Sequence, residues 1–158
     1  MNVFFEDFQI GETILLGAYK FERDAMIAFA RHYDPQPFHI DEDAAKATIY
    51  GSLTASGWHT ASAFMRCFID WIETKRQAAA ARGEDLPPTG VAPGVSDLRW
   101  PAPVRPRDVV TYSTVVQSKR AIHRPGWGLV TRRNFGVNQH GAEVLSFTSM
   151  VMTGRRST

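Results

Sequence analysis

The segment SGWHTASAFMRCFIDWIETKRQAAAARG, residues 56–83, has the longest helical pattern in the chain. Its apolar side chains recur at three- and four-residue spacing, the periodicity of one helix face; they are Trp58, Ala61, Met65, Phe68 and Ile72. Ile69 and Trp71 widen that face, so we expect the helix to contact more than one surface. Gly83, followed by two prolines, is typical of a helix end. The pattern predicts one long helix that starts just after Gly57.

The residues that follow this helix predict strands. A Pro/Gly-rich loop leads to three segments rich in β-branched residues, at 108–121, 128–138 and 142–154. The first is long enough that we expect it to be bent. Gln139-His140-Gly141 joins the other two as a hairpin turn.

The residues before the long helix predict one or two strands and two shorter helices. Residues 3–20 are expected to be extended and broken at Gly11, and a helix is expected from about Glu22 to Tyr33. A short helix from Asp41 to Ala47 would use Asp41 as its N-cap. Helices early and a meander late predict an α+β domain with a mostly antiparallel sheet.

Length and composition predict a single domain over residues 1–158. The chain is 44% hydrophobic and 22% charged, which is ordinary for a globular protein. A single cysteine, Cys67, excludes an internal disulfide framework and a cysteine-based zinc site. We see no signal-peptide pattern and no apolar run of membrane-spanning length, so we expect a cytoplasmic protein.

The net charge of +2 conceals an asymmetry between the two parts of the chain. Residues 1–98 contain 8 Lys/Arg and 14 Asp/Glu, whereas residues 99–158 contain 10 and 2. A basic part of this kind attracts phosphates, although a solvated arginine-rich strand face is an equal interpretation. We see no nucleic-acid-binding module in it.

The segment HYDPQPFHID, residues 32–41, contains the strongest candidates for a catalytic site. Asp34 and His39 are a carboxylate and a proton carrier that titrates near neutral pH. Five residues of extended chain span roughly 17 Å, so the two prolines must help the chain fold back if these groups are to meet. The alternative is that Asp34 ends one helix and His39 precedes the next. A metal site is a weaker interpretation, because the spacing has no zincin pattern.

A second candidate site lies at the start of the long helix, in SLTASGWHTA, residues 52–61. Backbone N–H groups near Gly57 lack helical acceptors and lie at the positive end of the helix dipole, so they can polarise a carbonyl oxygen. The alternative is ordinary capping by Ser56, with Gly57 allowing close packing. His59 is expected to be a packing residue.

The chain resembles the MaoC-like dehydratases, relatives of the (R)-specific enoyl-CoA hydratases. Four passages in the family's order carry the resemblance: FFEDFQIGE (4–12), ARHYDPQPFHIDEDAA (30–45), ASGWHTAS (55–62) and LRWPAPVRPRDVV (98–110). The resemblance implies a hot-dog fold, in which an antiparallel sheet wraps one long helix. It also implies that Asp34 and His39 activate a water for syn addition to a trans-2-enoyl thioester, while the N–H of Gly57 holds the thioester oxygen.

The sequence departs from the family at two positions near these residues. Gln36 stands where many relatives have Asn, and Ser56 stands where many have His before the helix glycine. Both are candidate substrate-binding residues, and both leave the natural substrate and the preferred direction open.

The resemblance leaves two alternatives to a hydratase or dehydratase. One is a non-catalytic module that binds acyl-CoA or an acyl carrier, and the other is a hot-dog thioesterase. A thioesterase needs a differently placed carboxylate, and the long helix offers only Asp70 and Glu73.

The expected ligand is an acyl-CoA or acyl-carrier thioester, with no cofactor, metal, nucleic acid or membrane partner. Cations of the basic part would bind the phosphates of CoA, with Arg105, Arg107 and Arg132 as candidates. Open sheet edges and the apolar helix predict at least a homodimer.

Overall fold

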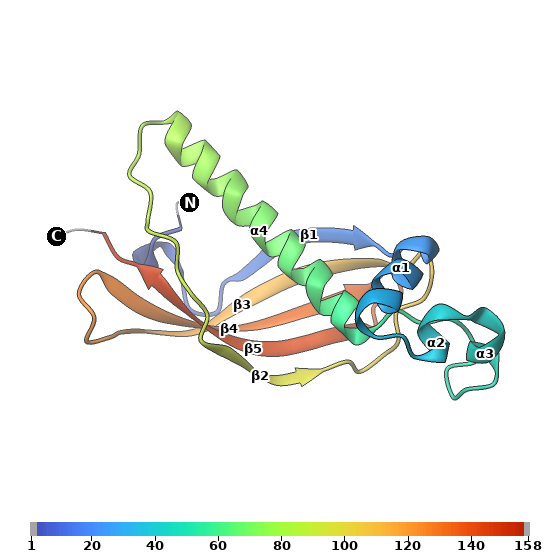
Figure 1. The fold of residues 1–158 in the computed structure, drawn as a ribbon. Coiled ribbons are helices and arrows are strands. Elements are labelled where there is room, and N and C mark those ends of the chain that lie inside the picture. Colours follow the sequence, from blue (N-terminus) through green and yellow to red (C-terminus); the bar gives the residue numbers. More distant parts are fainter. Residues whose placement is uncertain (1–2, 157–158) are drawn as a thin grey trace.

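The computed structural model describes residues 3–156 and is built on one five-stranded sheet (Figure 1). The strand order is β1-β3-β4-β5-β2, and every neighbouring pair is antiparallel. The strands are β1 (Thr13–Lys20), β2 (Gly94–Arg99), β3 (Val109–Ala121), β4 (Trp127–Asn138) and β5 (Glu143–Gly154). The chain thus forms a β3-β4-β5 meander and adds β1 and β2 at its two edges.

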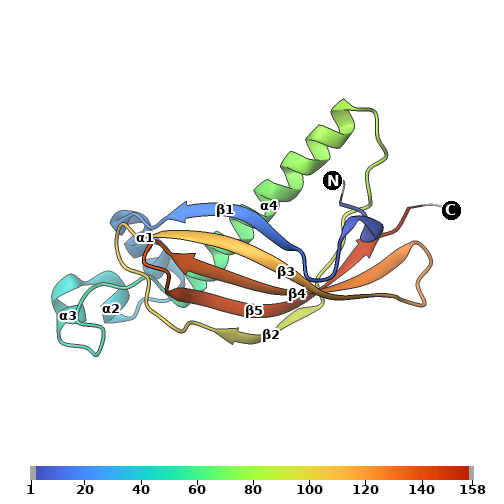
Figure 2. The same cartoon turned by 180° about the vertical axis from the view of Figure 1, so that it is seen from behind.

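One long helix, α4 (Gly57–Ala81), lies across one face of this sheet. Figure 2 shows the opposite face, with α4 behind the strands. An antiparallel sheet wrapped around one long helix is the hot-dog fold, so the expected fold is confirmed. None of the helices in residues 3–156 is long and apolar enough to cross a membrane.

The buried face of α4 differs from the apolar stripe that the sequence suggested. His59, Ala63, Phe64 and Cys67 point to the sheet and are buried, whereas Trp58 of the suggested stripe is 55% exposed. The stripe was misplaced because the buried face of α4 begins with two polar residues, His59 and Thr60, which pattern reading does not count as apolar. Met65 and Ile69 remain about half exposed on α4.

The N-terminal half of α4 is fixed to the sheet by aromatic packing. Phe64 contacts Phe147 edge to face at 4.9 Å between ring centroids, and Tyr112 at 5.9 Å. The buried Tyr112 hydroxyl donates to the carbonyl of Thr60 at 2.9 Å. Figure 1 shows the C-terminal half rising away from the strands. The start of α4 is therefore the rigid end, and the candidate site lies there.

Three short helices lie beside this rigid end (Figure 1). They are α1 (Arg23–Tyr33), α2 (Pro37–Ile40) and α3 (Glu42–Lys46). Asp41 caps α3 as predicted, because its side chain accepts the N–H of Ala44 at 2.8 Å. The sequence did not predict α2, a single turn that begins with Pro37, where a proline is tolerated.

The strands of the meander match their predicted ranges to within one residue. The predicted bend in β3 is confirmed by a register shift between Val116 and Ser118. The predicted turn before β5 is closed by a hydrogen bond from the N–H of Gly141, at φ +83°, to the carbonyl of Asn138.

Two elements contradict the expectations for the edges of the fold. The extended segment expected at 3–20 instead begins with a 3₁₀ turn, η1 (Phe5–Asp7), before β1. Residues 94–99, where the sequence predicted a loop through Gly94 and no strand beyond it, form the edge strand β2 against β5. All but Leu98 of the β2 residues are exposed, so the segment lacks the apolar alternation that marks a half-buried strand.

Candidate active site

The carboxylate of Asp34 and the imidazole of His39 meet in a fold of the chain between α1 and α2. Asp34 Oδ2 lies 3.4 Å from His39 Nε2, although the two residues are five positions apart in the sequence. Asp34 ends α1, and its carbonyl accepts the N–H of Gln36 at 2.8 Å, which reverses the chain. The N–H of His39 then donates to the carbonyl of Gln36 at 2.9 Å, so His39 lies in α2 and faces back to Asp34.

The backbone of residue 54 sets the orientation and tautomer of His39. Nδ1 lies 2.8 Å from the carbonyl oxygen of Thr54, which can only accept, so Nδ1 carries the proton. In neutral His39 the Nε2 atom then presents a lone pair toward Asp34. The ring is buried, and a T-shaped contact with Phe38 at 4.5 Å holds it further.

Two side chains hold the carboxylate of Asp34 ionised. Partial burial raises its pKa, but hydrogen bonds from Gln36 to Oδ1 (2.8 Å) and from Ser56 to Oδ2 (2.7 Å), with His39 nearby, lower the pKa further than burial raises it. At neutral pH, Asp34 is therefore an anion with a lone pair free on the atom nearest Nε2.

This arrangement gives two acceptors for the two hydrogens of one water. An ionised carboxylate and an imidazole lone pair cannot hydrogen-bond to each other, because neither has a proton to donate. A water beside both atoms can donate one O–H to each, which leaves its oxygen lone pairs free for nucleophilic attack. The pair is thus arranged for general acid–base chemistry.

The start of α4 supplies a backbone donor beside the pair. Ser56 is the N-cap, and its hydroxyl accepts the N–H of Trp58 at 3.2 Å while donating to Asp34. The N–H of Gly57, the first helical residue, has no acceptor among the described residues. A Cβ at Gly57 would lie 2.6 Å from the ring of Trp100, so glycine also allows close packing there. Both interpretations of this helix start are therefore compatible with the structure.

A cavity of about 420 Å³ opens onto these groups. Aromatic and apolar side chains form most of its wall, and they include Phe38, Tyr50, Trp58, Trp100, Val104 and Val144. Trp58 and Trp100 pack edge to face at 5.3 Å and remain partly exposed. A concave, mostly apolar site with a few convergent polar groups is typical of small-molecule binding.

The other histidines and acids of the motif lie away from the pair. His32 is exposed on α1, and Asp41 caps α3. Outside this motif, His59 on α4 is buried and stacks on Phe29 at 4.6 Å. Its Nδ1 has no hydrogen-bond partner in residues 3–156, and burial lowers its pKa to about 4. In residues 3–156, no group of three His, Cys, Asp or Glu side chains is placed to hold a metal.

The structure separates the three candidate arginines. The Arg105 guanidinium donates to the carbonyls of Ser52 (2.9 Å) and Tyr50 (2.7 Å), so it supports the loop behind the cavity. Arg107 is exposed, at φ +74°. Arg132 is buried under α4 in a different cavity, which removes the geometric basis for placing it beside the phosphates of a ligand at His39.

Sequence reasoning missed two contributors to the site. Thr54 acts through its backbone carbonyl, which no side-chain pattern reveals. Trp100 comes from the segment after β2 and reaches Gly57 across the fold. The one available signal for Trp100 was its place just before Pro101 in the passage LRWPAPVRPRDVV, residues 98–110.

Comparison with known proteins identifies a family and a fold. The model of the MaoC-like domain family matches residues 7–135. The structure of a MaoC-like dehydratase from Rhodospirillum rubrum is 34% identical, with a TM-score of 0.83 over 99% of this chain and 100% of that chain. An (R)-hydratase from A. caviae, involved in PHA biosynthesis, is 22% identical, with a TM-score of 0.67 over 92% of this chain and 97% of that chain, which shows the fold alone.

One curated protein also matches part of the chain. The uncharacterized protein YdeM of Bacillus subtilis (strain 168) is 31% identical over 68 residues, which is 43% of this chain. The match covers 46% of YdeM, so it spans about half the length of that relative.

Proposed function

The chain belongs to the MaoC-like domain family, and we propose that it adds water to, or removes water from, a trans-2-enoyl thioester. The observation that carries the proposal is the convergence of Asp34 and His39, with 3.4 Å between Oδ2 and Nε2, on a cavity beside the N-terminus of α4. The dehydratase from R. rubrum, similar over its whole length, supports the same reaction class.

In the hydration direction, one water donates to Asp34 Oδ2 and to His39 Nε2. As its oxygen attacks C3 of the enoyl group, one O–H bond breaks and the proton moves to Nε2. The electron pair of the C2–C3 double bond shifts toward the thioester oxygen, which the N–H of Gly57 and the helix dipole stabilise. The Nε2 proton then passes to C2 from the same face, which completes a syn addition and restores neutral His39.

The ionised Asp34 has two roles in this scheme. It orients the water, and it stabilises the imidazolium that forms at His39 during attack. Dehydration is the same sequence reversed, with His39 removing the C2 proton and returning it to the departing hydroxyl.

The position of the other acids argues against a thioesterase. Asp70 pairs with Arg66 one turn away on an exposed part of α4, and Glu73 accepts from Gln77 at 2.9 Å. Neither lines the cavity beside Gly57. A second carboxylate for thioester hydrolysis is therefore not supplied by this helix.

The test is the hydration of crotonyl-CoA, which is measured as the loss of the enoyl-thioester absorbance. Asp34→Asn and His39→Gln are each expected to lower kcat by about 10²–10⁴-fold, the usual size of a lost general acid–base group. Asp41→Asn and His32→Gln change the same residue types in the same segment without touching the cavity, and should retain wild-type turnover.

Three results would reject the proposal. They are no turnover of any enoyl-CoA by the wild type, wild-type rates in both site variants, or equal losses in the controls. Tight binding of the thioester without turnover would instead indicate a non-catalytic acyl-binding module. A panel of chain lengths, run with CoA and carrier-protein thioesters, would then define the substrate.

A further inference from the structure

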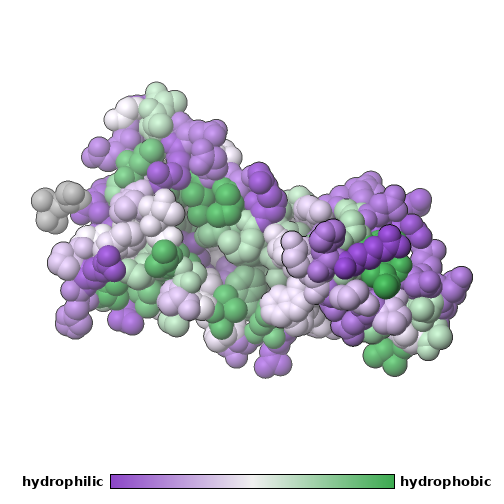
Figure 3. All heavy atoms as spheres, in the orientation of Figure 1, coloured by the Kyte–Doolittle hydropathy of each residue, from purple (hydrophilic) through white to green (hydrophobic). Residues whose placement is uncertain are grey.

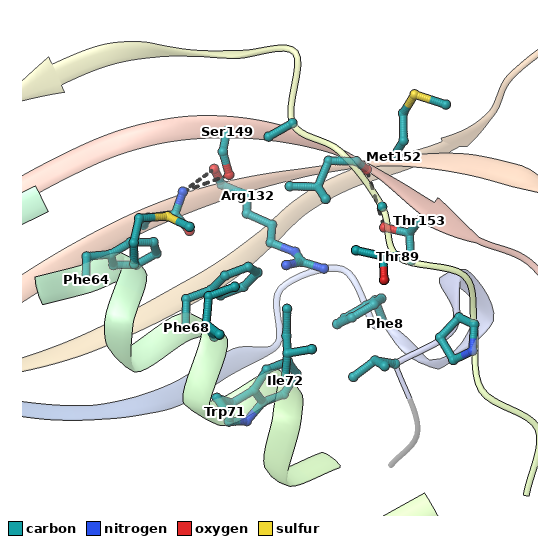
Figure 4. A pocket seen from close by; sticks show the side chains of 18 of the residues that line it. Phe8, Phe64, Phe68, Trp71, Ile72, Thr89, Arg132, Ser149, Met152 and Thr153 are labelled. Carbon is teal, nitrogen blue, oxygen red and sulfur yellow. Dashed lines mark hydrogen bonds between the residues drawn. The ribbon is translucent and has the colours of Figure 1, made fainter. Parts of the chain in front are cut away.

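A second cavity, of about 280 Å³, lies between the middle of α4, the sheet and the segment 87–92. Its lining shares no residue with the cavity at Asp34 and His39. The wall is largely apolar and includes Phe8, Phe68, Trp71, Ile72 and Met152 (Figure 4). Figure 3 shows apolar side chains gathered beside α4 on this face of the molecule.

The guanidinium of Arg132 points into the middle of this apolar cavity (Figure 4). Arg132 is on β4, and only 3% of the residue is exposed. Its charge lies over the ring of Phe8 at 4.4 Å and over that of Phe68 at 5.6 Å. Nε has no hydrogen-bond partner, and the guanidinium has no carboxylate partner in residues 3–156.

The polar groups near Arg132 do not supply the missing partner. The hydroxyl of Thr114 donates to Asn134 Oδ1 at 2.8 Å, and Asn134 Nδ2 donates to Ser149 Oγ at 2.9 Å, so these neighbours satisfy one another. Among the residues that the structure describes, the cavity lining contains a second cation, Arg76, and no aspartate or glutamate. This described part of the wall therefore carries positive charge without a counter-charge.

A structural role alone explains this arginine poorly. Burial lowers the pKa of Arg132 to about 10, so it stays charged at neutral pH. Burying a guanidinium without a counter-charge is unfavourable, and the two cation–π contacts offset that only in part. A neutral apolar residue would fill the same space without burying a charge. An anion bound in the cavity would supply the missing counter-charge.

We propose that this cavity binds a small aliphatic carboxylate, with its chain along α4 and its carboxylate paired to Arg132. The planar fork of a guanidinium matches a carboxylate with two parallel hydrogen bonds. A carboxylate needs fewer donors than a phosphate, and the buried cation among the described lining residues is Arg132. Its volume is near the lower end for ligand sites, which suits a short chain. This site is separate from the proposed active site and does not depend on its function.

The experiment is calorimetric titration of the whole protein with octanoate and with octanol, which have the same chain length and differ in charge. Trp71 in the cavity wall gives a fluorescence signal for the same titrations. We expect octanoate to bind about tenfold or more tightly than octanol, the value of one charge-assisted pair. Arg132→Met should abolish that preference while keeping octanol binding.

The matched control is Arg133→Met, the next residue on β4. Successive strand residues point to opposite faces, and Arg133 pairs with Glu143 at 2.6 Å away from the cavity. This variant should keep the preference for octanoate. Asp34→Asn should also keep it, so failure of the hydratase proposal would leave this result unchanged.

Several outcomes would overturn the proposed site. They are no binding of octanoate, equal affinity for octanoate and octanol in the wild type, or a preference that survives in Arg132→Met. If Arg132→Met does not fold, Arg132→Lys replaces it. Lysine keeps the positive charge but loses the planar guanidinium, so the ratio of octanoate affinity to octanol affinity should fall and remain above one. An unchanged preference in Arg132→Lys would contradict a bidentate pair.

Discussion

Removal of the Ser56 hydroxyl tests whether Ser56 stabilises the ionised Asp34 or only caps α4. Ser56 Oγ donates to Asp34 Oδ2 at 2.7 Å and accepts the N–H of Trp58 at 3.2 Å, so one atom both supports the carboxylate and caps α4. Ser56→Ala breaks both bonds. Loss of the cap should lower the free energy of unfolding by about 0.5–2 kcal/mol.

Loss of the hydrogen bond from Ser56 to Asp34 should make the ionised form of Asp34 less stable. A hydrogen bond to a charged group contributes about 1.5–3 kcal/mol. The low end applies here because the Asp34 side chain is 17% exposed, so water can replace part of the lost hydrogen bond. About 1.4 kcal/mol is a factor of ten in the ratio of ionised to protonated carboxylate. The pKa of Asp34 therefore rises in Ser56→Ala, toward or above its ordinary value.

The titration of the Asp34 carboxyl, followed by carbon-13 NMR, reads this change directly. A rate profile would not isolate it, because the proposed mechanism also needs a free lone pair on His39 Nε2. In the wild type, the midpoint of the Asp34 titration should lie below the ordinary value for an aspartate, because Gln36 and Ser56 donate to the carboxylate. In Ser56→Ala, this midpoint should move to higher pH, by about one pH unit for a tenfold change in the ratio of ionised to protonated carboxylate.

Asp41→Ala is the matched control for the cap. Asp41 caps α3 through one 2.8 Å bond to the N–H of Ala44, so its loss costs comparable stability without touching Asp34. Asp41→Ala should lower Tm and leave the midpoint of the Asp34 titration in place. A Ser56→Ala protein with reduced Tm but an unmoved Asp34 midpoint would refute the role given to Ser56.

Five further substitutions test other parts of the account. Gly57→Ala places a Cβ 2.6 Å from the Trp100 ring, so it should raise KM for crotonyl-CoA severalfold; an unchanged KM and unchanged Trp fluorescence would contradict this packing. His59→Phe should reduce the loss of stability in acid. The pKa of His59 is lowered to about 4 in the folded protein, so the wild type loses stability as the pH falls from 6.5 toward 4. If the urea midpoint falls by the same amount between pH 6.5 and pH 4 in the wild type and in His59→Phe, the prediction is wrong. Arg107→Ala should raise KM for CoA thioesters modestly, with an effect that disappears in high salt, whereas Arg105→Ala should mainly lower Tm, because Arg105 supports the Ser52 loop. Light scattering should report at least a dimer, because Met65, Ile69 and the edge strand β2 are exposed. Ile69→Lys should weaken this dimer. A wild-type protein that stays monomeric at micromolar concentration would contradict the expectation.

The sequence predicted the parts of the fold that depend on local periodicity and caps. The start of α4 after Ser56, the cap at Asp41 and the three strands of the meander follow from short-range preferences, and the structure confirms them. Edge strand β2 was missed because it is held by pairing with β5 rather than by its own composition. The buried face of α4 was misjudged because its first buried residues, His59 and Thr60, are polar.

The candidate site was predictable where one short segment contains its side chains. Asp34 and His39 could be chosen because stiff prolines separate two groups of suitable chemistry. Their 3.4 Å approach depends on backbone turns and on the carbonyl of Thr54, which only the folded chain provides. Arg132 could not be placed, because alternation along β4 leaves its face undetermined until the register is known.

The most direct test of the central claim is a double-mutant cycle of Asp34→Asn and His39→Gln, measured as kcat/KM for crotonyl-CoA. If both groups act on one water, removal of either abolishes most of the acid–base contribution. The double variant should then be no more than a few-fold slower than the slower single variant. Losses that multiply fully would show that the two residues act independently, and would contradict a shared water.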